Sequence, residues 1–350
     1  KASPANTHVI RHADKILTLE EAHFPWIVDD NLETIGSHDF NGKLNGPMTA
    51  HPRVCPETNE LLFFGYQMMK KPYLTYHRVN SDGELVQSEE IDIPRPVMMH
   101  DWNITRNYVI FMDLPLVFDL DQAVSGADPF GFRPECGARL GVMPRNGSNK
   151  DIKWININPC FVFHPMNAYE EDNKIILHVC RQNKAMVGGM DEIYGGKDTI
   201  GKLWKWTIDL DQETCEEEQV DNKACDFARV DDRLIGLKAK NGYAMAIDDN
   251  AKTLTFGQFL YKFNLENNER IDHNLGHNVY GGEPVFVPKE HDSSEDDGWI
   301  MAIVFDGNIN KSKLIIVDVE NFDKKPICEV ILPQRVPFGA HGSWLSNYKL

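Results

Sequence analysis

The feature that most constrains the fold is a series of short apolar runs, rich in β-branched and aromatic residues, separated by turn-forming residues. Runs of this kind are typical of β-strands. They cover residues 8–11, 16–19, 61–66, 73–78, 108–112, 175–179, 203–208, 299–305 and 314–319. Clusters at 80–83, 146–149, 241–242 and 306–308 supply the residues that reversals need. We expect an all-β fold without long helices.

The length of the chain favours a large β architecture. With 350 residues, 42% of them hydrophobic, it has enough apolar material for a sizeable core. Many short strands joined by turns are typical of a barrel, a two-sheet jelly roll or a propeller. No strict repeat distinguishes the propeller from the others. We treat residues 1–350 as a single domain.

The charge balance and the apolar segments narrow the classes of partner. Thirty-six Lys and Arg against 53 Asp and Glu give a net charge of −17, so nucleic acid is not an expected partner. No apolar stretch is long enough for a membrane-spanning helix. Seven dispersed cysteines without a CxxC pair predict neither a zinc ribbon nor a disulfide framework. We expect a soluble protein in a reducing, cytoplasmic compartment.

Four of the 13 histidines share one kind of setting: each lies beside Pro or Gly and apolar residues, at the edge of a predicted strand. They are His51, His100, His164 and His341. A buried imidazole costs free energy unless its nitrogens are satisfied, and a metal ion can satisfy several rings together. For any one of them, the alternative is a hydrogen-bonded structural histidine. Their spacing matches no local ligand motif, so both interpretations remain open.

The segments around these histidines resemble the carotenoid cleavage oxygenases, a family that includes apocarotenoid and stilbene cleavers and the isomerase of the retinal pigment epithelium. The blocks that carry the resemblance are GPMTAHPRV, MMHDWNIT, FVFHPMNAYEE, GGEPVFVP with EDDGWIMAIVFD, and VPFGAHGSWL. They occur in the family's order, and the resemblance extends from Ala5-Asn6-Thr7 to the C-terminus. It implies a seven-bladed β-propeller with a metal on its axis.

The resemblance also implies the metal and its ligands. The family holds a non-haem Fe(II) through four imidazoles, which correspond to His51, His100, His164 and His341. Neutral nitrogen ligands suit a divalent, redox-active iron, whereas thiolates would favour zinc or iron–sulfur clusters. Four ligands also leave positions open for oxygen.

Three carboxylates correspond to the family's partners of these ligands, one for each of three histidines. They are Glu21, Asp226 and Glu283. A carboxylate that accepts the outer N–H of a ligating imidazole determines its tautomer and orientation. Asp226 departs from the family's Glu, so its shorter side chain either draws the backbone inward, reaches through water or holds its ring less firmly. Thr7 matches a position whose methyl group lies near an open iron site in relatives.

The implied reaction is the insertion of both atoms of O2 across a carbon–carbon double bond of an apolar polyene, which gives two carbonyl products. In this scheme iron activates oxygen while the protein orients the alkene. Phe163, Phe338 and Met98, with Met99, are candidate substrate contacts because they adjoin predicted ligands. Ordinary core packing is the alternative for all of them.

Substrate choice separates two interpretations within the family. Stilbene cleavers use a Lys before the carboxylate that corresponds to Glu21, and this chain has Glu20 there. A carboxylate cannot donate as an ammonium does. This difference favours a carotenoid or apocarotenoid over a phenolic stilbene. Outside the family, a non-catalytic propeller that binds an apolar ligand or a protein and a zinc-dependent hydrolase of another β fold remain alternatives.

The N-terminus also departs from the family, whose members carry a long segment before the Ala-Asn-Thr motif. Here that motif begins at Ala5. We therefore expect a propeller that is incomplete at its N-terminus, with unpaired strand edges that another chain or fragment could cover. Any peripheral membrane contact is expected in the segment that these residues lack. The sequence does not determine the oligomeric state.

Overall fold

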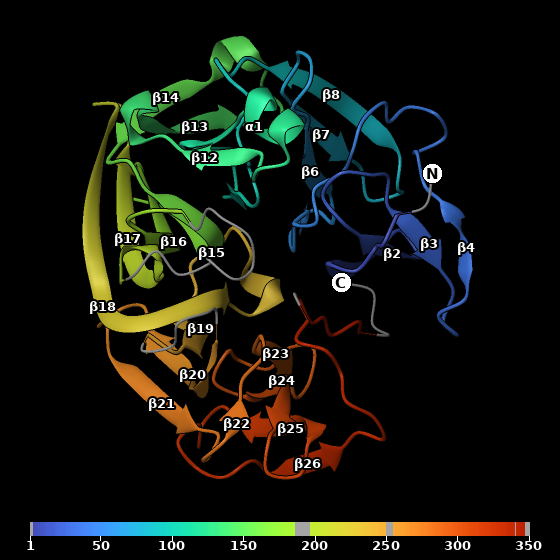
Figure 1. The fold of residues 1–350 in the computed structure, drawn as a ribbon, viewed down its shortest axis with the longest axis vertical. Coiled ribbons are helices and arrows are strands. Elements are labelled where there is room, and N and C mark those ends of the chain that lie inside the picture. The colour runs from blue at the N-terminus through green and yellow to red at the C-terminus, as the bar shows by residue number, and fades with distance from the viewer. Residues whose placement is uncertain (1–2, 186–196, 250–254, 340, 347–350) are drawn as a thin grey trace.

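The computed structural model describes residues 3–185, 197–249, 255–339 and 341–346. Nearly all of its regular structure is β-strand, and the sheets follow one another in chain order around a ring (Figure 1). The first sheet lies at the right of this ring and the last sheet at the bottom, with the C-terminal segment between them (Figure 1). The expected all-β, propeller-like arrangement is confirmed.

Three sheets contain four strands each. The first is β1 (His8–His12), β2 (Lys15–Leu19), β3 (Trp26–Val28) and β4 (Thr34–Ser37). The second is β5 (Arg53–Val54), β6 (Leu61–Tyr66), β7 (Leu74–Val79) and β8 (Leu85–Ile91). The third has the order β14 (Lys153–Ile157), β13 (Ala138–Pro144), β10 (Tyr108–Asp113) and β9 (Asn103–Ile104).

The second half of the chain forms two larger sheets. Seven strands hydrogen-bond in sequence order: β15 (Phe161–Glu171), β16 (Lys174–Gln182), β17 (Lys202–Asp209), β18 (Thr214–Arg229), β19 (Asn241–Ile247), β20 (Phe256–Asn264) and β21 (Arg270–Asn274). The last sheet contains β22 (Val279–Tyr280), β23 (Val285–Pro288), β24 (Gly298–Asp306), β25 (Lys311–Asp318) and β26 (Cys328–Ile331).

A small insertion interrupts the third sheet. It consists of the pair β11 (Leu116–Phe118) and β12 (Phe130–Phe132) and the helix α1 (Leu120–Ser125). Asp119 caps the helix by accepting the backbone N–H groups of Asp121 and Gln122, and Gly126 ends it at φ 81°. Among the described residues, no helix is long and apolar enough to cross a membrane.

The expected count of seven blades is wrong for the described residues. Four separate sheets have the size of one blade, namely the three four-stranded sheets and the five-stranded one. The remaining large sheet is continuous because β18, with 16 residues, pairs with β17 through its first part and with β19 through its last part. Chain length and turn spacing could not reveal that one strand serves two neighbours.

One predicted turn is also wrong. Asn241 and Gly242 begin β19 instead of reversing the chain. A Cβ on Gly242 would lie 2.2 Å from the Met166 sulfur, so the glycine allows β15 to pack closely against this strand. The predicted turns at 80–83, 146–149 and 306–308 do join strands. All seven cysteines are free thiols.

The edge strands of the sheets position the site. In the hydrogen-bonded orders, β1, β5, β9, β15 and β22 each end a sheet. Large apolar residues fill the sheet interiors, among them the fully buried Trp102 and Trp206.

Candidate metal centre

Four segments that are far apart in the sequence bring one histidine each to the centre of the molecule. His51 lies just before β5, His100 just before β9, His164 within β15, and His341 in the segment after β26. One nitrogen of each ring lies within 4.8 Å of the corresponding nitrogen of every other. We call these four residues the histidine cluster.

A strand bulge orients one of these side chains, and backbone hydrogen bonds hold another in place. The pairing of β15 with β16 shifts register on both sides of Pro165, which has no N–H to donate to the ladder. This bulge directs the adjacent His164 out of the regular alternation. At the C-terminus, the His341 N–H donates to the Thr7 carbonyl (3.2 Å) and the Ser343 hydroxyl donates to that of Val9 (2.6 Å). Contacts with the first sheet thus anchor the last histidine.

The inner nitrogens of the cluster are suited to a cation. Nε2 of His100 lies 3.1 Å from Nε2 of His51 and 3.2 Å from Nε2 of His164. Nδ1 of both His100 and His164 faces a carboxylate, which only accepts hydrogen bonds, so each Nδ1 carries the proton and each Nε2 presents a lone pair. Two acceptors at this separation repel each other unless a positive charge lies between them. Bonds of about 2.1 Å to one ion would give a similar separation.

Each of the three predicted carboxylates contacts a different ring. Glu21 Oε1 lies 2.7 Å from Nδ1 of His100, Asp226 Oδ1 lies 2.9 Å from Nδ1 of His164, and Glu283 Oε1 lies 2.9 Å from Nδ1 of His341. The structure therefore brings together all seven predicted ligands and carboxylates. In metal sites, such contacts determine the tautomer and the direction of the ligating nitrogen.

Asp226 reaches its histidine directly, although its side chain is one methylene shorter than Glu. The register of β18 against β19 shifts between Asp226 and Arg229. Phe227 adopts φ 54°, in the left-handed region that is rare for a bulky residue. This bulge brings the main chain close to His164. Of the three expected ways to accommodate the shorter acid, the direct 2.9 Å contact excludes the one that uses a bridging water.

Burial favours neutral rings at His51 and His341, whereas at His100 the neighbouring Glu21 outweighs burial and raises the pKa. Burial lowers the pKa of His51 well below its ordinary value of 6.5, and the neighbouring His341 lowers it further. Burial also lowers the pKa of His341. Burial would raise the pKa of Glu283, but His341 and Arg229 outweigh this effect and hold that pKa below its ordinary range. Metal ligands require this combination, since only a neutral imidazole can coordinate.

The other predicted residues lie at different distances from the cluster. Thr7 adjoins it through the backbone bond to His341. The Phe163 ring packs edge-on against the His100 ring at 5.4 Å. Met98 packs against the apolar core beside β10 and β15. Phe338 is 51% exposed and contacts Phe256. The substrate roles of these residues stay predictions.

Several residues that sequence reasoning missed surround the cluster. Tyr66 donates to Glu21 (2.5 Å), Arg229 contacts Glu283 (3.2 Å), and Asp101 lies 3.3 Å from Nδ1 of His51. The His8 ring lies 5.4 Å from that of His341. Asp101 directly follows a predicted ligand and Arg229 follows Asp226 by three positions, so those motifs held a signal. Nothing in the sequence indicates Tyr66.

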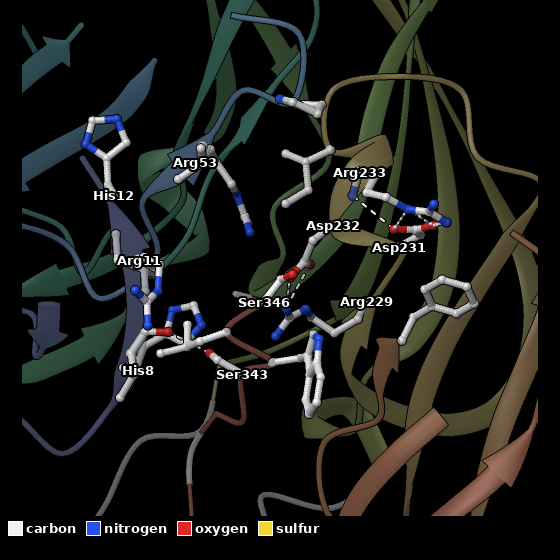
Figure 2. A pocket seen from close by; sticks show the side chains of 18 of the residues that line it. His8, Arg11, His12, Arg53, Arg229, Asp231, Asp232, Arg233, Ser343 and Ser346 are labelled. Atoms are coloured by element: carbon white, nitrogen blue, oxygen red, sulfur yellow. Dashed lines mark hydrogen bonds and ion pairs between the residues drawn. The ribbon is translucent and has the colours of Figure 1, made fainter. Parts of the chain in front are cut away.

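A cavity of about 770 Å³ reaches the cluster from one side (Figure 2). Its lining includes three cluster histidines, together with charged side chains that point into it, among them Arg53 and Arg229 (Figure 2). The predicted apolar contacts are not among its lining residues. Charged and apolar side chains share this lining, and the apolar ones include Phe286, Trp299 and Trp344.

Comparison with known proteins agrees with this geometry. The family model described as "Retinal pigment epithelial membrane protein" matches residues 1–346. The carotenoid 9,10(9',10')-cleavage dioxygenase 1 of Arabidopsis thaliana is 33% identical over 99% of this chain and 67% of its own length. A carotenoid cleavage oxygenase of Mycobacterium tuberculosis is 31% identical over 97% of this chain and 76% of its own length. The chain thus spans two thirds to three quarters of these relatives.

A solved structure of a variant of the Synechocystis apocarotenoid oxygenase superposes with a TM-score of 0.90 at 27% identity, covering 99% of this chain and 75% of the other. The lignostilbene dioxygenase of Pseudomonas brassicacearum superposes with a TM-score of 0.88 at 28% identity, covering 97% and 75%. Because the family model matches residues 1–346 and the Arabidopsis relative is 33% identical, the chain belongs to the carotenoid cleavage oxygenase family, the family of the retinal pigment epithelial membrane protein.

Proposed function

We propose that this chain is a non-haem Fe(II) dioxygenase that cleaves a carbon–carbon double bond of a carotenoid or apocarotenoid. One O2 is consumed and each alkene carbon receives one oxygen atom, so that two carbonyl products form. The observation that carries the proposal is the convergence of four imidazole nitrogens within 4.8 Å. Carboxylates behind three of the rings support it.

The four imidazole ligands favour iron over metals that prefer thiolate ligands. All four inner donors are imidazole nitrogens. Nitrogen ligands suit divalent iron, and four of them leave positions open for oxygen. Ferrous iron, when bound, would supply the activation of O2 that an organic side chain cannot provide.

The protein's own residues would orient this centre and hold its charge. Glu21, Asp226 and Glu283 accept the outer N–H groups and keep the inner lone pairs directed to one point. Their negative charge offsets that of a divalent ion. No residue is needed as a nucleophile or a general base, because both product oxygens come from O2.

A row of packed aromatic rings beside the histidine cluster supports the inference that the substrate is apolar. Phe227 packs on His164 at 4.5 Å, Phe256 packs on Phe227 at 5.6 Å, and Phe338 packs on Phe256 at 5.1 Å. Phe338 is half exposed, so the row leads from the cluster to solvent. We assign this row, with Phe163, whose ring lies 6.2 Å from that of His164, to the walls that contact the polyene. Conjugated chains bind well to aromatic surface.

The substrate class rests on the relatives and on one residue. Relatives at 31–34% identity are named for carotenoid cleavage, whereas a relative at 30% is named isoeugenol monooxygenase. Glu20 accepts hydrogen bonds and offers no ammonium to a phenolic substrate. A phenolic stilbene is the second candidate, because the structurally similar Pseudomonas protein is named for lignostilbene.

The test is anaerobic purification with ferrous iron, followed by reaction with ¹⁸O2. We expect about one iron per chain, oxygen uptake with an apocarotenal, and one labelled oxygen in each carbonyl product. Turnover of a lignostilbene alone would move the proposal to the second candidate. Ester hydrolysis without oxygen uptake would indicate a metal hydrolase, and bound ligand without any turnover would indicate a non-catalytic propeller. Either result would overturn the proposal.

A further inference from the structure

The fourth histidine of the cluster also has a carboxylate beside its outer nitrogen, which resemblance to the family does not imply. Oδ2 of Asp101 lies 3.3 Å from Nδ1 of His51. Asp101 is 3% exposed, so its carboxylate has no free access to water. The contact is longer than the three others in the cluster, which measure 2.7–2.9 Å.

A network of short contacts holds Asp101 in this position. Its Oδ1 accepts from Nη2 of Arg53 and from the backbone N–H of Trp102, both at 2.6 Å. The same Arg53 nitrogen donates to the Trp102 carbonyl (2.9 Å), and the Trp102 indole donates to the His51 carbonyl (2.8 Å). The network therefore joins both the ring and the main chain of His51 to one fixed carboxylate.

The charge of this network resembles that around His341, where Arg229 contacts Glu283, and differs from that around His100 and His164. Arg53 lies against Asp101, extends into the cavity (Figure 2) and offsets the carboxylate's charge. Among the described ion pairs, neither Glu21 nor Asp226 has an arginine partner. Asp101 can therefore orient an imidazole while it adds little net negative charge around the cluster.

We propose that Asp101, anchored by Arg53, is the positioning residue that directs Nε2 of His51 toward the bound metal. The inference rests on the proposed function, since it requires that the cluster binds a divalent ion. It completes a pattern in which every ring of the cluster has its own carboxylate. Its contribution should be smaller than that of Glu283 because its contact is longer.

The test compares Asp101→Asn with a matched control, Asp113→Asn. Asp113 is a buried aspartate (5% exposed) paired with Arg139 at 2.7 Å in β10, and no ion pair is described between it and a histidine. Each purified chain is stripped of metal and titrated with Co(II), and the visible absorption of the bound ion reports its ligand geometry. We expect Asp101→Asn to bind Co(II) about 3- to 10-fold more weakly, with a shifted spectrum, while Asp113→Asn matches the wild type.

Asp101→Glu restores the charge and should recover part of the affinity. Arg53→Met, which keeps Asp101 but removes its anchor, should weaken binding in the same direction; it replaces Asp101→Asn if that variant does not fold. Wild-type affinity and spectrum in both Asp101→Asn and Arg53→Met would overturn the inference alone, as would an equal loss in Asp113→Asn. A wild-type chain that binds no Co(II) would overturn the proposed function and the inference together.

Discussion

The buried histidines at the centre of the ring and those inside the sheets differ in what their outer nitrogens contact. Within the sheets, His77 lies 2.8 Å from the Ser88 hydroxyl and His273 lies 2.8 Å from the Phe322 carbonyl. Neither nitrogen of the buried His178 has a hydrogen-bond partner in the part of the chain that the structure describes. In the cluster, a carboxylate faces every ring. Among the described residues, no carboxylate lies within ion-pair distance of His77, His178 or His273.

This difference shows that burial by itself does not identify a ligand. Burial lowers the pKa of His77 and His178 to about 4, so both rings are neutral near pH 7. They lack neighbours that present converging lone pairs, and they lack an anion that would stabilise the charge of a bound cation. The arrangement around the imidazole therefore separates a structural histidine from a candidate ligand.

The strongest test of this comparison removes one ring from each region. His164→Ala should abolish cleavage and reduce bound iron to below about a tenth of the wild-type amount, because three donors and an unpaired Asp226 remain. His77→Gln, in the sheet interior, should retain its iron. Metal analysis of both purified variants, with product formation from an apocarotenal, measures the effect. Full activity in His164→Ala would remove that residue from the ligand set.

A smaller effect is expected from removing charge behind a ring while its shape is kept. Glu283→Gln should reduce the cleavage rate or iron affinity about 10- to 100-fold, the range usual for partners of metal ligands. The amide can still accept from Gly342 N–H, which Glu283 does at 2.7 Å, so folding should be preserved. Steady-state kinetics and an iron titration give the measurement. An unchanged variant would show that the carboxylate has no role at the metal.

The sheet histidines should affect stability instead of activity. The folded-state pKa of His178 lies near 4 and its ordinary value is 6.5, so the unfolded chain binds a proton first as the pH falls. Its contribution therefore destabilises the fold progressively from pH 6.5 down to about 4, by about 2 kcal/mol at pH 5. Urea unfolding of wild type and His178→Leu at pH 7 and pH 5 measures this. Equal pH dependence in both proteins would contradict the assignment.

The smallest effect is expected where the cluster departs from its family. Asp226→Glu should leave activity within about threefold of the wild type, because the longer side chain still offers a carboxylate to His164. The left-handed backbone at Phe227 is the feature that must relax to admit the extra methylene. Relative activity and melting temperature report the outcome. A variant that does not fold would mean that the backbone has adapted strictly to the shorter acid.

The sequence predicted the strand-rich fold and the histidine cluster for different reasons. Strand positions such as 61–66 follow from local alternation and turn residues, and β6 begins and ends where it was predicted. The cluster followed from motif resemblance, since gaps between its members are too long for any local spacing rule. The count of seven blades came from the resemblance, and local patterns could not show that both ends of β18 pair within one continuous sheet.

The sequence by itself determined which residue types are available: an acidic chain rich in strand formers, with four histidines in apolar turns and three carboxylates in matching motifs. Only the tertiary structure decided that Asp226 reaches its ring directly, that Tyr66 and Arg229 support two carboxylates, and that Asp101 lies beside His51 instead of its neighbour His100. The physical reason is how far apart in the sequence the interacting residues lie. Strand formation and turns depend on adjacent residues, whereas the direction of a buried polar side chain depends on groups that folding brings together from distant segments.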